Sequence, residues 1–423
     1  MDFLDFLNNS VTPYHTVESL KAVLGNKDNG SVRLFERGGA LIAVRLPKNI
    51  CSDSRFRIAL AHTDFPTLKI TPNPDLVAAG VRSIHPEIYG SPLFTSWLDR
   101  DLGYAGLLAY EIDGKLQTKL IRGEKLFRIP QLAVHMNRGV NQDGLKVNPQ
   151  TDLNALWTAV GGPEAFSKVL SAELPAGAQL LDFDVQLFDA QPAQFGGFEN
   201  EWIYSGRLDN LSSCHAVVEA FAAAGALEKD FAVAAFFNNE EVGSTTREGA
   251  AGNFLKSVLE NVAMSAALDS STSLRSAQND KSLSPLVCSE LASVLSSSFA
   301  LSIDMAHACH PNFVQKHEPN HAPILGGGIV LKVNSQKRYA SDVFSNAQFK
   351  LLCKQSNVSY QTFVMRNDMP CGSTVGPDIS ASLGISTVDI GEPMLSMHSI
   401  REMTAVKDHE SVIRLLDQFY SGK

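Results

Sequence analysis

Short apolar runs that lead into histidine or acidic residues are the feature of this sequence that most constrains its fold. Phe231–Phe237 is continuously apolar, which is typical of a strand that is buried on both faces, and Phe56–Leu60, Leu301–Ile303 and Ile385–Ile390 are further short, apolar-rich runs. Between them, Leu211–Ala224 carries apolar residues at helical spacing. Buried strands that alternate with helices predict an α/β fold, with a mixed, mostly parallel sheet sandwiched by helices.

Five potential metal ligands stand at or soon after the ends of these runs or just before a helix: His62, Asp209, Glu241, Asp304 and His398. In open α/β sheets the carboxyl ends of the strands form the ligand crevice, so we expect these side chains to gather along one edge. Zinc accepts imidazole nitrogen and carboxylate oxygen. Two-metal sites also occur, and a shared carboxylate can bridge the two ions.

Two further acids accompany these candidates. Glu240 directly precedes Glu241, and neighbouring side chains at a strand end can diverge, so that one binds metal and the other faces a bound water. His62 and Asp64 form a His-x-Asp pattern. Residues two apart in an extended segment face the same side, so Asp64 can accept the second ring N–H of His62.

Each of these residues taken singly has an ordinary structural explanation. Asp209 alone would make a good helix cap, the pair Glu240 and Glu241 would be solvated acids, and His398 alone is uninformative. Their common position near strand ends is what favours a functional site over these separate explanations.

The chain has 423 residues, which fits two domains. The stretch from Pro86 to Trp202 has short strand-like pieces, such as Tyr104–Tyr110, separated by Gly, Pro, Asn and Asp. It also lies between segments that carry candidate ligands. We therefore expect a β-rich domain at 86–202 inserted between two parts of a catalytic domain, 1–85 and 203–423.

Composition excludes some classes of protein. The formal net charge of -9 argues against a nucleic-acid partner. The six cysteines have no C-x-x-C spacing, which is typical of reduced thiols in an intracellular protein. The first residues are acidic where a secretory signal is basic, and no apolar stretch reaches the roughly 18 residues that span a bilayer. A cytoplasmic location without membrane contact is the expectation.

Around these residues the sequence resembles the aspartyl aminopeptidase family of metallopeptidases, peptidase family M18. The resemblance runs from Thr12 to Glu402, which is nearly the whole chain. Long pieces carry it: Ala61–Asp64, Trp97–Leu102, Arg128–His135, Asn239–Ser244, Asp304–Asn312, Val333–Ser335, Arg366–Thr374 and Met397–Glu402. It implies a zinc-exopeptidase-like catalytic fold, and it implies that the inserted domain is a dimerisation domain.

The resemblance also implies two divalent metal ions per subunit, zinc first, with manganese or cobalt also suited to the ligands. Asp209 would bridge the two ions. One ion would also bind Glu241 and His398, and the other would also bind His62 and Asp304.

The remaining roles come from the same resemblance. Glu240 would be the general base, with Asp64 beside it in the catalytic set. His307, Lys332 and Tyr339 would lie around the substrate pocket. His135 resembles a histidine that reaches into a neighbouring subunit's active site, in dodecamers that are built from dimers.

The function implied is the release of N-terminal residues from peptides, with a preference for Asp and Glu that Lys332 would supply. Phe65 stands where a small residue is common in the family, which puts the side-chain preference in doubt. An aminopeptidase of neutral residues, a metallo-carboxypeptidase and an N-deacylase are the enzymatic alternatives. An oligomeric peptide-binding scaffold is the alternative outside enzymes, and the complete ligand set disfavours it.

Overall fold

The computed structural model describes residues 1–27, 32–51, 53–271 and 292–422. Its largest sheet has eight strands in the order β1-β2-β12-β3-β13-β17-β15-β16. The strands are β1 Val32–Arg37, β2 Ala40–Arg45, β3 Phe56–His62, β12 Phe231–Phe237, β13 Phe299–Ile303, β15 Ile329–Val333, β16 Tyr360–Val364 and β17 Ser386–Gly391. The apolar-rich runs of the sequence therefore form the centre of this sheet.

The pairing in this sheet is mixed. β12, β3, β13 and β17 run parallel to one another, and β15 runs parallel to β16. The pairs β1 with β2, β2 with β12, and β15 with β17 are antiparallel. The α/β fold with a mixed, mostly parallel sheet is thus confirmed.

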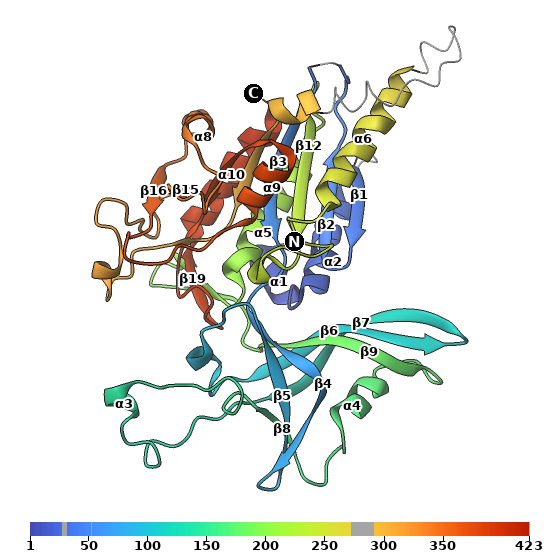
Figure 1. Ribbon diagram of the computed structural model, residues 1–423, viewed down its shortest axis with the longest axis vertical. Helices are drawn as coiled ribbons and strands as arrows, with labels where there is room; N and C mark the ends of the chain where they lie inside the picture. The colour runs from blue at the N-terminus through green and yellow to red at the C-terminus, as the bar shows by residue number, and fades with distance from the viewer. Residues whose placement is uncertain (28–31, 52, 272–291, 423) are drawn as a thin grey trace.

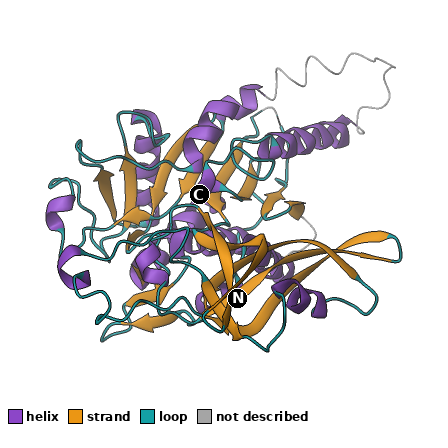
Figure 2. Ribbon diagram, turned by 60° about the horizontal axis from the view of Figure 1, so that its bottom comes forward, coloured by secondary structure: helices purple, strands orange, loops and turns teal. Residues whose placement is uncertain are grey.

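Helices bury both faces of the sheet, and alternate residues of one strand show this directly. In β12, Ala232, Ala234 and Phe236 pack in one apolar cluster, while Phe231 and Val233 pack in another. The first cluster contains residues of α1, α2, α5, α8 and α10, and the second contains residues of α6 and α9, so that helices flank the sheet on both sides (Figure 2). Their bounds are α1 Phe3–Asn9, α2 Pro13–Lys27, α5 Leu208–Ala223, α6 Phe254–Ser271, α8 Val343–Ser356, α9 Val375–Leu383 and α10 Val406–Ser421.

A second lobe, drawn below the first in Figure 1, is built on a six-stranded antiparallel sheet in the order β7-β6-β9-β4-β5-β8. Its strands are β4 Thr67–Ala78, β5 Val81–Tyr89, β6 Leu102–Ile112, β7 Lys115–Phe127, β8 Ala155–Ala159 and β9 Gln179–Asp189. Helix α4, Phe166–Ala172, packs Phe166 and Leu170 into its core, and the short helix α3 spans Val140–Asp143.

The chain enters this lobe earlier than the sequence indicates. It leaves the eight-stranded sheet after His62 and joins the six-stranded sheet at Thr67, so the division expected at residue 86 falls within β5. The change in sequence composition that suggested residue 86 comes only within the second strand of the lobe. The first two strands of the lobe both carry enough apolar residues, such as Leu68 and Ile84, to read like catalytic-domain sequence.

A small five-stranded sheet, in the order β10-β11-β19-β18-β14, joins segments that flank the candidate ligands. Its strands are β10 Gln194–Gly196, β11 Trp202–Ser205, β14 Ala306–His307, β18 Pro393–Leu395 and β19 Glu402–Ala405. β14 lies at one edge of this sheet. Among the described residues, no helix is both long enough and apolar enough to cross a membrane.

Candidate metal centre and substrate cavity

Three neighbouring parallel strands deliver four of the functional candidates to one edge of the main sheet. His62 is the last residue of β3 and is paired with Phe237, the last residue of β12. Glu240 and Glu241 follow β12 in a short 3-10 turn, and Asp304 follows β13 directly. Because parallel strands end at the same edge, these side chains meet there.

Asp209 reaches the same place from the start of α5. Arg207 before it has a left-handed backbone with φ 65°, which turns the chain from β11 into the helix. The carboxylate is buried, and its Oδ1 accepts no hydrogen bond from the described residues. A buried carboxylate oxygen without a donor is costly unless a cation compensates it.

His398 comes from the loop between β18 and β19, where it adopts φ 65°. Its Nε2 lies 3.5 Å from Oδ2 of Asp209 and 3.5 Å from Oε2 of Glu241. On the other side, Nε2 of His62 lies 3.5 Å from Oδ1 of Asp209 and 3.5 Å from Oδ1 of Asp304. The two carboxylate oxygens of Asp209 therefore face two separate sets of potential metal ligands, which we call the donor groups. Oδ1 faces the group of His62 and Asp304, and Oδ2 faces the group of His398 and Glu241.

These spacings fit metal ligation better than hydrogen bonding. Two donors that are each about 2.1 Å from one ion lie roughly 3.4 Å apart in a tetrahedral site. The potential ligand atoms of His62, Asp209 and Glu241 all lie within 4.8 Å of one another. Imidazole and carboxylate donors of this kind, with a net negative charge in a buried cleft, suit divalent cations such as zinc.

The electrostatics point the same way. Burial raises the pKa of Glu240 to about 8; repulsion from Asp304 adds to this effect and the charge of His62 opposes it. Burial lowers the pKa of His398, but its hydrogen bond to Asp209 and the charge of Glu241 outweigh burial and raise it to about 10. Without metal, protons on Glu240 and His398 thus offset the negative charge of the clustered carboxylates. Bound cations would displace these protons and offset the same charge.

Asp64 has a different set of contacts from the one that the sequence suggests. Nδ1 of His62 donates to the main-chain oxygen of Asp64 at 3.0 Å, while the carboxylate is 3.4 Å away. That carboxylate accepts hydrogen bonds from the main-chain N–H groups of Glu240 and Glu241, both at 3.1 Å. It also accepts one from the hydroxyl of Tyr89 at 2.7 Å. Asp64 thus orients both the histidine and the turn that carries the two glutamates.

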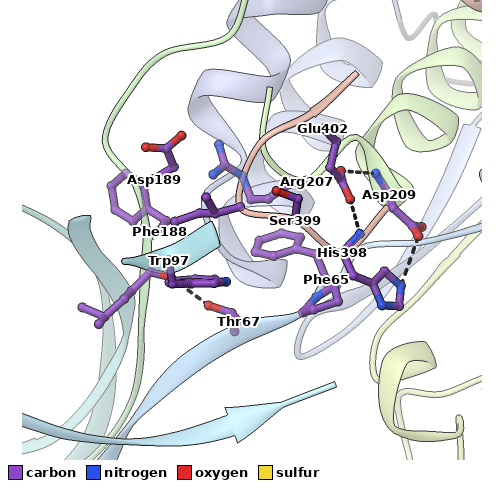
Figure 3. Close-up of a pocket in the computed structure, with 13 residues that line it drawn as sticks. Phe65, Thr67, Trp97, Phe188, Asp189, Arg207, Asp209, His398, Ser399 and Glu402 are labelled. Carbon is purple, nitrogen blue, oxygen red and sulfur yellow. Dashed lines mark hydrogen bonds and ion pairs between the residues drawn. The ribbon is translucent and has the colours of Figure 1, made fainter. Parts of the chain in front are cut away.

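Two supporting residues were not singled out from the sequence. Glu402 accepts hydrogen bonds from the main-chain N–H of Asp209 at 3.1 Å and of His398 at 2.7 Å, and it so joins two candidate ligands (Figure 3). Tyr89 comes from β5 of the second lobe. Glu402 lies in a stretch that the sequence does flag, Met397–Glu402, but nothing in that stretch indicates these contacts.

A cavity of about 510 Å³ opens over the candidate ligands. It is lined by His307, Lys332 and Tyr339, the residues that the family resemblance puts around the substrate pocket. Lys332 is almost fully buried, its Nζ lies 3.4 Å from Oδ2 of Asp304, and it stands 5.6 Å from the centre of the Tyr339 ring. Burial and the charge of Lys332 lower the pKa of His307 to about 4, so this imidazole is neutral near pH 7.

Two residues do not lie in this cavity. His135 is exposed in the segment between β7 and β8, and it is not among the residues that line the cavity of this chain. Phe65 is buried and lines a separate space of about 20 Å³ behind Asp209 and His398 (Figure 3). Phe65 therefore has no direct contact with the larger cavity.

Comparison with known proteins gives a consistent picture. The family model described as aminopeptidase I zinc metalloprotease (M18) matches residues 6–420. A probable M18 family aminopeptidase 2 of Streptomyces avermitilis is 39% identical, over 100% of this chain and 97% of its own length. The probable M18 family aminopeptidase 2 of Pseudomonas aeruginosa strain UCBPP-PA14 is 36% identical, over 99% of this chain and 97% of its own.

Solved structures agree. The cryo-EM structure of the Ape4 and Nbr1 complex contains a chain that is 32% identical, with a TM-score of 0.89 over 99% of this chain and 84% of that chain. The S. cerevisiae mApe1 dodecamer is 26% identical, with a TM-score of 0.79 over 99% of this chain and 95% of that one. The family expected from the sequence is confirmed, and it favours an aminopeptidase over a carboxypeptidase, a deacylase or a scaffold. The chain belongs to the M18 family of aminopeptidase I zinc metalloproteases and is a metallo-aminopeptidase.

Proposed function

We propose that this metallo-aminopeptidase binds two divalent ions per subunit and releases N-terminal residues with Glu240 as general base. Zinc is the first choice, and manganese or cobalt would suit the same donors. The division of the Asp209 oxygens between two donor groups carries the proposal. Asp209 would bridge the ions, with His62 and Asp304 on one side and Glu241 and His398 on the other.

When bound, the two ions would supply positive charge that makes an attacking water more acidic and polarises the scissile carbonyl. Glu240 lines the cavity with its Oε2 4.0 Å from Nε2 of His62. From there it would take the proton of the attacking water and pass it to the leaving amine. Neutral His307 keeps one ring N–H, which would stabilise the developing negative charge on the carbonyl oxygen.

Lys332 would favour substrates with an N-terminal Asp or Glu, because it is the lysine that lines the cavity. One observation favours the alternative, an aminopeptidase of neutral residues. The ammonium group of Lys332 already faces Asp304 at 3.4 Å, so part of its charge is compensated before any substrate binds.

A panel of amino-acid amides, Asp, Glu, Leu, Ala and Lys, tests both points, each with and without a chelator. Chelator-sensitive hydrolysis supports the metal mechanism. Preference for Asp and Glu that disappears in Lys332→Ala supports the acidic pocket, whereas preference for Leu or Ala supports the neutral alternative. An unchanged preference in Lys332→Ala would remove Lys332 from the account.

We also propose that the chain forms a homo-oligomer, and the dodecamer of its structural relative mApe1 supports that assembly. His135 is exposed on the second lobe, where a neighbouring subunit could use it. Light scattering gives the mass of the assembly. If His135 reaches a neighbour's site, His135→Ala lowers activity without changing that mass; unchanged activity would argue against this role. The cytoplasmic location expected from the sequence stays a prediction.

A further inference from the structure

A second cavity, of about 230 Å³, adjoins the substrate cavity. The two share His307, Phe363 and Met397 among their lining residues. His307 belongs to β14, the edge strand of the five-stranded sheet, and Met397 directly precedes the candidate ligand His398. The second space therefore lies directly beside the one over the candidate ligands.

The lining of the second cavity combines methionines with polar groups, since three histidines, Lys316, Glu318 and Arg366 belong to it as well. Four of the chain's nine methionines line it, Met365, Met369, Met394 and Met397. Together with Phe363 and Leu395 they form what we call the methionine groove. β18 and the loop after it form one wall, the end of β16 with the segment after it forms the second, and the segment from His307 to Glu318 forms the third. Methionine is flexible and polarizable, so a groove of this composition accepts apolar side chains of varied shape.

The size of the neighbouring spaces shows where the rest of a peptide can go. The small space behind Asp209 also shares lining residues with the substrate cavity, but at about 20 Å³ it has room for about one water. The methionine groove is more than ten times larger. Two other spaces of similar or larger size, about 230 Å³ beside Arg57 and about 400 Å³ beside Asp101, share no lining residue with the substrate cavity.

We propose that the methionine groove binds the side chain of the substrate's second residue, the first residue of the leaving peptide, and prefers large apolar side chains there. This inference rests on the proposed aminopeptidase function. An N-terminal residue that is cleaved over the candidate ligands leaves the following residue in the adjoining space. Filling a hydrophobic pocket discriminates by about tenfold or more for each methylene-sized difference.

The test compares dipeptide amides that share one N-terminal residue, the one hydrolysed fastest in the amide panel, and that differ in the second residue: Gly, Leu, Phe or Glu. The readout is kcat/KM for each peptide relative to the Gly peptide, because a ratio is insensitive to loss of folded protein. For the wild-type chain we expect Leu and Phe to exceed Gly by about tenfold or more, and Glu to show no such gain.

Met369→Gln makes the groove polar, and the side chain is 38% exposed, so the fold tolerates the change. We expect the ratio of Leu to Gly to fall severalfold in this variant. Met264→Gln on α6 is the matched control: it makes the same substitution at a methionine that is 53% exposed and lines neither cavity, and it should keep the wild-type ratio.

The outcomes separate this inference from the function on which it rests. Absence of hydrolysis of every amide would overturn the proposed function itself. Hydrolysis with equal rates for Gly, Leu and Phe at the second position would overturn the methionine groove as a subsite and leave the aminopeptidase in place. If Met369→Gln left a strong preference for Leu and Phe at the second position unchanged, that side chain would bind outside the methionine groove, and the inference would be wrong.

Discussion

The two halves of the candidate metal centre are built in different ways. His62 and Asp304, the strand half, stand at the ends of the adjacent strands β3 and β13. Glu241 and His398, the loop half, stand in a short turn and in the loop before β19. The side chain of His62 is 2% exposed and that of His398 is 28% exposed. The two histidines thus differ in exposure, whereas the side chains of Asp304, at 11%, and Glu241, at 6%, are both little exposed.

The supports of the two histidines differ in the same way. His62 donates to the main-chain oxygen of Asp64, two residues further along its own strand end. His398 lies 3.1 Å from the main-chain oxygen of Ser91, and its own oxygen accepts from the N–H of Leu93, both in the segment that follows β5 of the second lobe. The loop half therefore depends on contact between the two lobes. We expect an ion in the loop half to be held less tightly than one in the strand half.

Removing the residue that both halves share should have the largest effect. Asp209→Ala takes one oxygen from each donor group, so we expect both ions to be lost and the rate of peptide hydrolysis to fall by about 10⁴-fold or more. Metal analysis of the purified variant gives the ion count. Retention of one tightly bound ion would show that the two halves do not depend on Asp209 in the same way.

Changing the base next to the strand half should be the next largest effect. Glu240→Gln keeps the shape of the side chain but cannot take a proton, so we expect kcat to fall by about 10² to 10⁴-fold. The ion count should stay at the wild-type value, because Glu240 lies 4.0 Å from His62 and belongs to neither donor group. A near-normal kcat would assign the base to another residue.

Exchanging the two histidines for alanine compares the halves directly. His62→Ala should lower the stability of the metal-free protein more than His398→Ala, by about 2 kcal/mol, because it leaves buried carboxylates without their partner. Thermal unfolding in the presence of a chelator measures this difference. Equal melting temperatures for the two variants would contradict the expectation that His62 contributes more to the stability of the metal-free protein than His398.

The smallest effect should come from the second lobe's support of Asp64. Tyr89→Phe removes a 2.7 Å hydrogen bond to the Asp64 carboxylate and should weaken metal binding or activity by about 10-fold. Tyr110→Phe is the matched control, since its hydroxyl bonds Gln117 within the six-stranded sheet. Both variants are assayed for kcat/KM and metal affinity. Equal values for the two would mean that the Tyr89 contact has no functional consequence.

The same contrast explains what could be predicted from the sequence. The strand half follows apolar-rich runs, and parallel strands in an α/β protein end at one edge, so His62 and Asp304 could be placed together. His398 lies seven residues beyond the end of β17, and a strand and a left-handed backbone turn separate them. Its place in a loop after a strand end made it a candidate, but only the family resemblance assigned it to one ion together with Glu241.

Contacts that cross between sheets were beyond prediction. Tyr89 belongs to the second lobe and Glu402 to the five-stranded sheet, and neither carries a local pattern that points to Asp64 or to Asp209. The entry into the second lobe was misplaced for a related reason. β4 and the start of β5 have apolar residues that fit either domain, and only their pairing partners assign them to the six-stranded sheet.

Stepwise removal of metal is the most direct test of whether the centre consists of two halves that Asp209 joins. The protein is treated with increasing chelator while bound metal per chain and amide hydrolysis are measured together. We predict two ions per chain that leave in two steps. His398→Ala should accelerate the first step at least as much as Tyr89→Phe does. A single ion per chain, or two ions that leave together in the wild type and in both variants, would contradict a centre with a strand half and a loop half joined by Asp209.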